Sequence, residues 1–371
     1  MESLKPGRRV VVSEFAESPL EAIDKHLSLQ EMPAPDPAKL SPRDVIIVIK
    51  SASVGWVDLL MTSGQYQHMP SPPYCPGLEY SGEVAWVGAD VRGVTVGDAV
   101  MADGFLAGPR SHGSYQQYGG FASYAAVPME AVRPIPGGLS FDQACNLLGN
   151  YETAYHCLAA RADLRRGETV LIHGASGSTG LAAVHVAKLL GATVIATGRS
   201  DTKLNVVKEQ GADHVINCTN VDGASGIRPF RDEVKAVTGG KGVDVVYDGV
   251  GGDISLESLR AVRFGARFLI VGWASTPFVA KGKGQRGAPN ANMLPTNLIM
   301  MKGLNVLGCP MVISTVMDPS LRVPRLEQVW RWAETGQIRP HVSRVFPLDE
   351  FKAAMRAKWN GDVIGGCVLR P

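Results

Sequence analysis

The stretch VLIHGASGSTGL, residues 170–181, passes from an apolar strand pattern through Gly174, Gly177 and Gly180 into the start of a helical pattern. Glycines at this spacing make a tight turn, let the backbone approach a pyrophosphate closely and let the helix pack on its strand. The first N–H groups of the helix and the positive end of its dipole then attract phosphate. A second strand pattern, TVIATG (193–198), follows the helix. The stretch therefore predicts a dinucleotide-binding turn at the opening of a parallel sheet.

Two other motifs resemble this stretch without matching it. A P-loop ends in Gly-Lys-Ser/Thr, and no lysine follows the turn before Lys188. A nucleophile elbow, G-x-S-x-G, needs glycine where Ser178 stands. Ser176 is therefore a poor candidate for a nucleophile. We assign Ser176, Ser178 and Thr179, together with the three glycines, to the cofactor turn.

The end of the second strand, within TVIATGRSDTK (193–203), indicates which dinucleotide is bound. An NAD-dependent enzyme would place a carboxylate there to accept hydrogen bonds from the ribose hydroxyls. We find no such carboxylate at the strand end, where Arg199 and Lys203 stand instead, and two cations suit the 2′-phosphate of NADPH. The alternative is a solvated basic helix start, which the helix dipole disfavours. NADPH is therefore the predicted cofactor.

The composition excludes several classes of protein. With 371 residues, 45% of them hydrophobic and 19% charged, the chain is long enough for about two domains. No apolar run is long enough to span a membrane, and MESLKPGRR lacks the apolar segment of a secretory signal, so a cytoplasmic location is expected. The six cysteines contain no C-x-x-C pair, which is typical of reduced thiols. A formal net charge of +2 favours neither nucleic acid nor a membrane surface as partner.

The pattern along the chain changes near residue 139. Before it, Pro- and Gly-rich turns separate short β-type runs such as DVIIVIK (44–50), which indicates an irregular, barrel-like β domain. Beyond it, strands and helices alternate, which predicts a doubly wound parallel sheet. The predicted α/β organisation is a β-rich substrate domain of residues 1–138 and 312–371 and a Rossmann dinucleotide-binding domain of residues 139–311. The expected strands and helices of the second domain are TVLIHG (169–174), GLAAVHVAKLLG (180–191), TVIATG (193–198), SDTKLNVVKEQG (200–211), HVINC (214–218), VDVVYDGV (243–250) and ARFLIVGW (266–273).

Most of the chain resembles a known family. The runs that carry the resemblance are SVGWVDLLMTSGQY (53–66), PYCPGLEYSGEV (73–84), GNYETAYHCL (149–158), RRGETVLIHGASGSTGLAAVHVAKLLGATVIATGRSDTKL (165–204), GVDVVYDGVGG (242–252), GARFLIVGWAS (265–275) and TGQIRPHVSRVFPLDEFKAAM (335–355). They are similar to the zinc-independent quinone oxidoreductase and enoyl reductase branch of the medium-chain dehydrogenase/reductase superfamily. The resemblance implies a GroES-like substrate domain, a Rossmann cofactor domain and an oxidoreductase that uses NADPH.

The zinc-dependent alcohol dehydrogenases of that superfamily hold their metal with a Gly-His-Glu segment and two cysteines. Here the matching segment reads Gly77-Leu78-Glu79, and neither cysteine position is kept. His68, Cys75 and Glu79 stand close in sequence, but we interpret this segment as a proline-broken loop with a buried thiol. Because a catalytic zinc needs three protein ligands, no metal site is predicted, and activity is expected to survive chelation.

Without a Lewis acid, the resemblance implies hydride transfer from NADPH to a carbon–carbon double bond activated by a carbonyl group. Tyr66 matches a tyrosine that enoyl-thioester reductases of the family use near the nicotinamide. Trp56 departs from the family's asparagine in G-x-N-x-x-D and would narrow the cleft, while Asp58 would order the pocket or accept backbone hydrogen bonds. Tyr66, Trp56 and Asp58 are therefore the candidate catalytic residues. Beside Arg199, Lys203 and the residues of the turn, the candidate cofactor residues are Thr153, Asn217, Val250, Trp273, Ala274, Ser275 and Asn360.

Several alternatives stay open. The substrate is an enone, an enoyl thioester or a quinone, and a non-catalytic NADPH-binding protein, such as the lens crystallins of the family, is a different class. A hydrolase is excluded by the incomplete elbow. Cations of the loop 281–286 (KGKGQR) could reach a phosphate of an acyl-CoA. The expected partners are a small-molecule substrate and a second copy of the chain.

Overall fold

The computed structural model describes residues 4–66, 70–111, 113–220, 226–276 and 291–371, so the loop 281–286 lies outside the described residues. The chain divides into two compact units. Met1–Leu148 and Ala333–Pro371 belong to the first, and Gly149–Val279 and Ala288–Trp332 belong to the second. The division runs at Leu148 and Trp332, whereas the sequence places the domain boundaries at residues 138/139 and 311/312, which stay a prediction.

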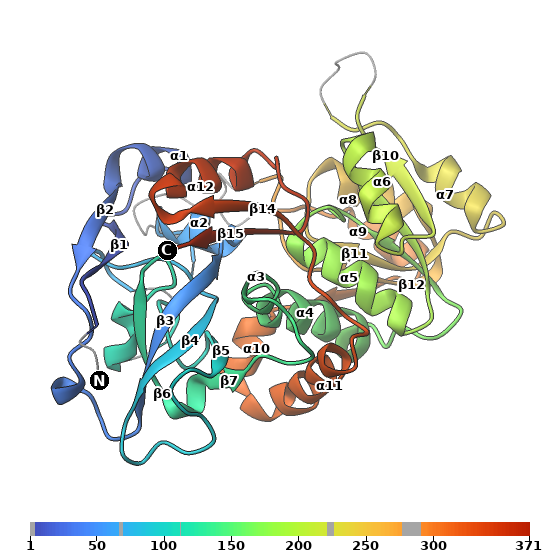
Figure 1. The fold of residues 1–371 in the computed structure, drawn as a ribbon. Coiled ribbons are helices and arrows are strands. Elements are labelled where there is room, and N and C mark those ends of the chain that lie inside the picture. The colour runs from blue at the N-terminus through green and yellow to red at the C-terminus, as the bar shows by residue number, and fades with distance from the viewer. Residues whose placement is uncertain (1–3, 67–69, 112, 221–225, 277–290) are drawn as a thin grey trace. The chain divides into compact units, whose positions relative to one another are not determined.

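The second unit contains a six-stranded sheet with helices on it (Figure 1). Its strands lie in the order β10-β9-β8-β11-β12-β13, and every pair is parallel. Their bounds are β8 Thr169–Ile172, β9 Thr193–Gly198, β10 His214–Asn217, β11 Val243–Asp248, β12 Val262–Ile270 and β13 Asn305–Gly308. The helices are α4 Leu148–Tyr155, α5 Ser178–Leu189, α6 Asp201–Glu209, α7 Arg231–Val237, α8 Asp253–Ala261, α9 Thr296–Met301, α10 Met311–Met317 and α11 Arg322–Glu334, and a π-helical segment spans His156–Arg161.

This strand order places β8 next to the point where the chain reverses its direction of travel across the sheet. From β8 the chain moves outward through β9 to β10, then returns to pair β11 on the other side of β8. Ligands bind beyond the carboxyl ends of strands at such a reversal. The strands are continuous apolar runs because both faces of the sheet are covered, and Leu171, Ile195 and Phe268 are fully buried between them.

The first unit is built on a mostly antiparallel sheet. Its strands follow the order β14-β15-β3-β4-β5-β7, with β6 on β3, and a separate pair β1-β2. Their bounds are β1 Gly7–Val12, β2 Leu27–Met32, β3 Asp44–Ser53, β4 Tyr80–Val87, β5 Ala99–Ala102, β6 Tyr124–Pro128, β7 Val132–Pro134, β14 Val342–Pro347 and β15 Gly366–Arg370. The helices are α1 Pro19–Glu21, α2 Trp56–Met61, α3 Phe141–Ala144 and α12 Phe351–Trp359. The long strand β3 pairs with β4, β6 and β15, which curves the sheet toward a barrel.

The segment 141–161 forms two short helices and a π-helical segment in place of one continuous helix. Ser140 caps α3 and accepts a hydrogen bond from the Gln143 N–H. The helix then ends at Ala144, and the chain makes a turn before α4 and the π-helical segment. These breaks place Asn146 in the first unit, where its Oδ1 accepts from the Ser53 hydroxyl at 2.8 Å.

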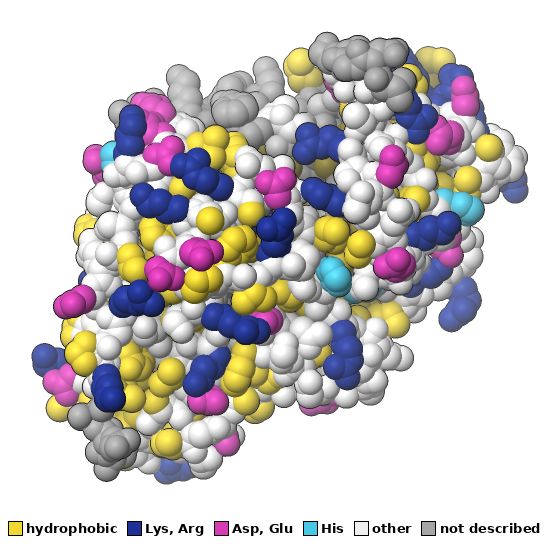
Figure 2. All heavy atoms as spheres, turned by 45° about the horizontal axis from the view of Figure 1, so that its top comes forward, with side chains coloured by type: hydrophobic (Ala, Val, Ile, Leu, Met, Phe, Trp, Pro, Cys, Tyr) yellow, Lys and Arg dark blue, Asp and Glu magenta, His cyan; other side chains and the backbone are white. Residues whose placement is uncertain are grey.

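Among the described residues, no helix combines the length and the apolar character that crossing a bilayer requires. On the face drawn in Figure 2, basic and acidic side chains are interspersed with apolar ones, so neither sign of charge dominates that face.

Candidate functional site

The turn between β8 and α5 requires glycine at two of its three predicted positions. Gly174 has a φ of +60°, a conformation that side chains disfavour. At Gly180 a Cβ atom would lie 2.3 Å from the Gly174 oxygen, so only glycine lets the helix approach the turn. At Gly177 the nearest atom to a Cβ would be the Gly174 oxygen at 3.3 Å. The backbone of the turn is therefore in close contact with Gly180, whereas its distance from Gly177 is larger.

The first turn of α5 follows Gly177, which is the N-cap residue of the helix. The first N–H groups of a helix have no partner within the helix and are available to an anion. Ser176 and Ser178 are half-buried here. The Thr179 hydroxyl donates to Asn150 Oδ1 at 3.0 Å, which ties α5 to α4. The groups of this turn that could bind a phosphate are therefore backbone N–H donors.

A buried histidine, His173, stabilises the strand ends next to the turn through hydrogen bonds. His173 lies between the Thr197 hydroxyl, 2.8 Å from Nδ1, and the Ser258 hydroxyl, 2.6 Å from Nε2. Because the Ser258 hydroxyl donates to the Ile254 oxygen, it accepts from Nε2–H, and Nδ1 accepts from Thr197. Burial lowers the pKa of His173 to about 4, so the ring is neutral at physiological pH. The histidine fixes the ends of β8 and β9 relative to α8.

Two loops meet the turn at the same edge of the sheet. A Cβ on Gly174 would lie 3.2 Å from a methyl group of Val250, in the loop after β11. The Ser275 N–H and hydroxyl donate to the Val250 oxygen at 2.9 and 2.8 Å, and the Ala274 N–H donates to Gly249. Trp273, in the loop after β12, is 48% exposed. The structure therefore brings Gly174, Val250, Ala274 and Ser275 together, with Trp273 beside them.

The candidate 2′-phosphate residues lie after β9. Arg199 is exposed, and Lys203 is half-buried in the first turn of α6. Asn217, at the end of β10, donates to Asp201 Oδ1 at 2.9 Å. Asp201 is a carboxylate three residues beyond the end of β9, in the stretch in which no carboxylate was expected to face the ribose.

Arg228 is a third cation at this edge. Its Nε and Nη2 donate to the Asn217 oxygen at 2.9 and 2.6 Å, and its Nη1 contacts Glu233. No spacing in the sequence indicates this position, because Arg228 reaches Asn217 through a fold-back of the chain between β10 and α7.

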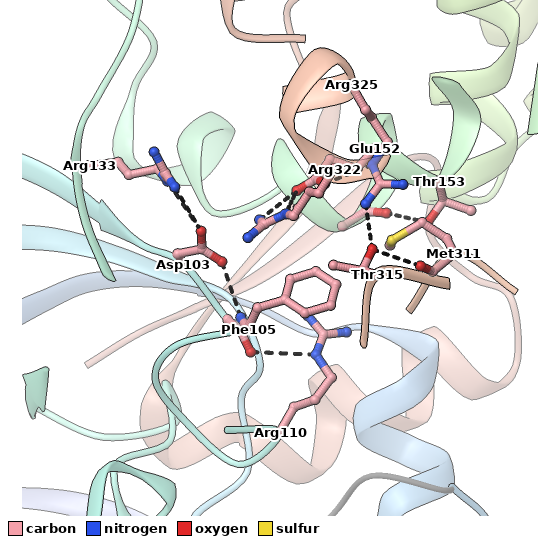
Figure 3. A network of polar contacts seen from close by, with 12 residues as sticks. Asp103, Phe105, Arg110, Arg133, Glu152, Thr153, Met311, Thr315, Arg322 and Arg325 are labelled. Atoms are coloured by element: carbon pink, nitrogen blue, oxygen red, sulfur yellow. Dashed lines mark hydrogen bonds and ion pairs between the residues drawn. The ribbon is translucent and has the colours of Figure 1, made fainter. Parts of the chain in front are cut away.

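Thr153 lies on α4, in the second unit, and its hydroxyl donates to the Gly149 oxygen at 2.6 Å. The neighbouring Glu152 is 1% exposed and accepts from Arg325 Nε at 2.9 Å and from Arg322 Nη2 at 2.8 Å. Arg325, also 1% exposed, donates through Nη2 to the Thr315 hydroxyl at 2.6 Å (Figure 3). These bonds hold α10 and the start of α11 on α4 and fix the helix that carries Thr153.

In the first unit, α2 carries two of the candidate catalytic residues. Asp58 is buried and accepts from the N–H groups of Gly55, Gly77 and Leu78 at 2.9, 3.1 and 3.0 Å. Burial raises the pKa of Asp58 to about 6, against the lowering effect of these hydrogen bonds. Its carboxylate thus joins the start of α2 to the segment 77–78.

Trp56 stacks on Trp359 of α12, with ring centroids 5.2 Å apart and planes 5° from parallel. Asn360 follows Trp359 as the C-cap residue of α12 and is exposed. The stack therefore brings Trp56 and Asn360 into one neighbourhood of the first unit.

Tyr66 follows α2 in the chain and is half-buried against the core of the first unit. Within the described part of the chain its hydroxyl has no hydrogen-bond partner. The ring is therefore held by packing, while the phenol is available to a ligand.

The segment around Cys75 contains the buried thiol that its sequence predicts. The Cys75 thiol lies 3.6 Å from the oxygens of Pro76 and Gly119, and burial raises its pKa to about 12. His68 lies outside the described residues. The described residues contain no group of three or more His, Cys, Asp or Glu side chains that could hold a metal ion.

Comparison with known proteins gives two matching family models. Residues 41–137 match the alcohol dehydrogenase GroES-like domain, and residues 178–322 match the zinc-binding dehydrogenase family. Together with the all-parallel sheet of the second unit, these matches confirm the predicted fold class, a GroES-like domain and a Rossmann domain.

Curated relatives and solved structures resemble the chain over most of its length. The quinone oxidoreductase-like protein 2 homolog of Nematostella vectensis is 31% identical over 331 residues, covering 88% of this chain and 82% of the relative. The quinone oxidoreductase of Sus scrofa is 30% identical over 311 residues, covering 83% of this chain and 84% of the relative. The crystal structure of a probable oxidoreductase from Mycobacterium abscessus has a TM-score of 0.78 and 28% identity and covers all of both chains.

Proposed function

The chain belongs to the quinone oxidoreductase-like proteins of the medium-chain dehydrogenase/reductase superfamily, and on that basis we propose that it is an NADPH-dependent reductase of activated carbon–carbon double bonds. The observation that carries the proposal is the arrangement at the carboxyl edge of the parallel sheet. There the Gly174–Gly180 turn, the loop of Val250 and the loop of Ser275 touch one another beside the switch point of the sheet. Arg199 and Lys203 follow the next strand.

The residues present fit a dinucleotide phosphate. A Cβ at Gly180 would fill the space in which the helix meets its turn, and the N-terminus of α5 provides backbone donors. Ser176, Ser178, Thr179 and the turn glycines would hold the pyrophosphate, and Arg199, Lys203 and Asn217 the adenosine end. In the second unit, the residues that would hold the nicotinamide end are Val250, Trp273, Ala274, Ser275 and Thr153. NADPH, when bound, supplies the hydride.

The chemistry left to the chain is orientation and proton supply. As hydride reaches the β-carbon of an enone or enoyl thioester, negative charge develops on the carbonyl oxygen, and the α-carbon then takes a proton. Tyr66 is the proposed donor, because its phenol has no partner in the described part of the chain and its ring is held by packing. We propose that Asp58 and the Trp56–Trp359 stack hold the residues around the substrate in place.

A quinone is the second candidate substrate, and the names of the relatives favour it. It would take the hydride that NADPH supplies when bound, but it needs less help with protons, because its hydroquinone oxygens are protonated from water. Binding of NADPH without oxidation by either substrate class would instead identify a non-catalytic binding protein.

We expect NADPH to be preferred over NADH by at least about tenfold in kcat/KM, the scale of one charge-assisted contact. The double substitution Arg199→Ala with Lys203→Ala should abolish this preference, because both cations near the ribose are removed. Lys208→Ala, at the exposed far end of the same helix, is the control and should leave the preference unchanged. Equal use of both cofactors by the unmodified protein would contradict the assignment.

We also propose a homodimer formed through β13, the edge strand of the parallel sheet. In the described part of the chain β13 pairs with a strand on one side, β12, and large apolar side chains of this unit are exposed. They include Phe264, Met300, Met301, Val306 and Met317, with 75%, 73%, 66%, 38% and 80% of their surface exposed.

Light scattering should therefore give twice the mass of one chain at micromolar concentration. Val306→Lys with Met301→Lys should reduce it to a monomer, since lysines at an edge strand oppose pairing. Val96→Lys, at an exposed position of the first unit, should not change the mass. A monomeric unmodified protein would refute the proposed dimer.

A cytoplasmic location remains part of the proposal. It is supported by the six cysteines, all of which are free and buried in the structure, as in proteins of reducing compartments.

A further inference from the structure

Arg110 occupies an unusual position in the loop that follows β5. It is half-buried, and its guanidinium carbon lies 4.6 Å from the ring centroid of Phe105 (Figure 3). Its Nε donates to the Gly104 oxygen at 3.4 Å. The cation–π contact and the carbonyl fix the plane of the guanidinium.

Most of the donors of this guanidinium are uncommitted. Arginine carries five N–H donors in a planar fork, and in the described part of the chain Arg110 uses one of them, in the bond to Gly104. Arg133 shows the contrast within the same unit: two of its nitrogens donate to Asp103, a buried carboxylate, at 3.2 and 3.1 Å. Among the described residues Arg110 has no carboxylate partner of this kind, although it is half-buried.

Arg110 stands beside the candidate substrate residues of its own unit. A Cβ on Gly104 would lie 2.6 Å from the Leu78 oxygen and 3.3 Å from Arg110 Nη2, so the loop packs directly on Leu78. The Leu78 N–H in turn donates to Asp58. Burial raises the pKa of Asp58, and the positive charge of Arg110 opposes this rise only slightly, after the backbone N–H groups that occupy the carboxylate, so the two side chains form no ion pair. The charge of Arg110 is therefore left for another anion.

We propose that Arg110 binds an oxygen anion of the substrate, a role that rests on the proposed reductase function. A planar fork with free Nη groups matches a carboxylate, and it also suits a single oxygen on which charge develops. The anion has two possible sources. One is a permanent carboxylate on the substrate, and the other is the enolate or phenolate oxygen that forms as hydride is transferred.

The test compares two enones, a 4-oxo-2-alkenoic acid and its methyl ester, in the unmodified protein and in Arg110→Met. A permanent carboxylate predicts a KM for the acid raised at least about tenfold, with the ester unaffected. A developing oxyanion predicts a kcat lowered about 10²-fold for both substrates with little change in KM. Either pattern supports the inference, and unchanged kcat and KM for both substrates would overturn it.

Three further measurements distinguish a role of Arg110 in substrate binding from misfolding and from a failure of the proposed reductase function. Arg110→Lys keeps the charge and loses the fork, so its loss should be intermediate, and it covers the case in which Arg110→Met does not fold. Arg92→Met, an exposed arginine of the same unit that donates to loop carbonyls, should behave as the unmodified protein. NADPH affinity, followed by fluorescence, should be the same in all variants. If the unmodified protein binds NADPH but reduces neither enone, the proposed function fails, whereas reduction by a fully active Arg110→Met removes only the inference.

Discussion

Tyr66→Phe is expected to lower kcat for an enone by about 10²–10³-fold, the usual loss when a general acid or oxyanion donor is removed. The substitution keeps the ring that packs on the core of the first unit and removes only the hydroxyl. Folding and NADPH affinity should therefore survive, and the loss should fall on the chemical step. Single-turnover oxidation of bound NADPH measures that step directly.

The same variant separates the two substrate classes. A quinone takes its protons from water, so Tyr66→Phe should lose much less activity towards quinones than towards enones. Tyr118→Phe, another half-buried tyrosine of the first unit, is the control and should retain activity with both. Equal and small losses on both substrates would reduce Tyr66 to a packing role and favour the quinone as substrate.

Glu152→Gln is expected to destabilise the protein by about 3–5 kcal/mol, because it leaves Arg325 buried without a countercharge. Both side chains are 1% exposed, and Arg322 donates to the same carboxylate. Equilibrium unfolding in urea, followed by a signal from the second unit, measures the change. Since α10 and α11 are held on α4 through this carboxylate, their release should accompany the loss.

Asp163→Asn provides the control. Asp163 pairs with Arg165 at 2.7 Å, but both side chains are 72% exposed, and such surface pairs contribute about 0–1 kcal/mol. Asparagine also tolerates the positive φ of this position. A loss below about 1 kcal/mol for Glu152→Gln would mean that water reaches the arginines and that the buried network is not a structural anchor.

The Rossmann unit could be predicted closely from the sequence because its signals are local. TVIATG (193–198) coincides with β9, and Gly174 and Gly180 stand where positive φ and close approach require glycine. The sequence of the first unit contains fewer local signals of this kind. Strand β6, for example, has only five residues and pairs with β3, an element from a distant part of the sequence, so no local periodicity indicates this pairing.

The site was predictable to the extent that its residues lie at strand ends. Arg199, Val250 and Ser275 could be placed by counting from the strands, and the structure puts them at the carboxyl edge of the sheet. Arg228 and Arg110 could not be found in this way, because neither stands at a strand end, and their contacts with Asn217 and Gly104, 11 and 6 residues away, follow no periodic pattern. The stacking of Trp56 on Trp359 joins helices about 300 residues apart in sequence, so no local pattern announces it.

Transfer of deuterium from C4 of labelled NADPH to an enone would demonstrate the proposed reduction itself. The expected product is a saturated ketone with one deuterium at the β-carbon and a solvent proton at the α-carbon, formed in equal amount to the NADPH consumed. Labelled NADPH that is bound but neither transfers deuterium to the β-carbon of the enone nor is oxidised by a quinone would contradict the assignment as a reductase.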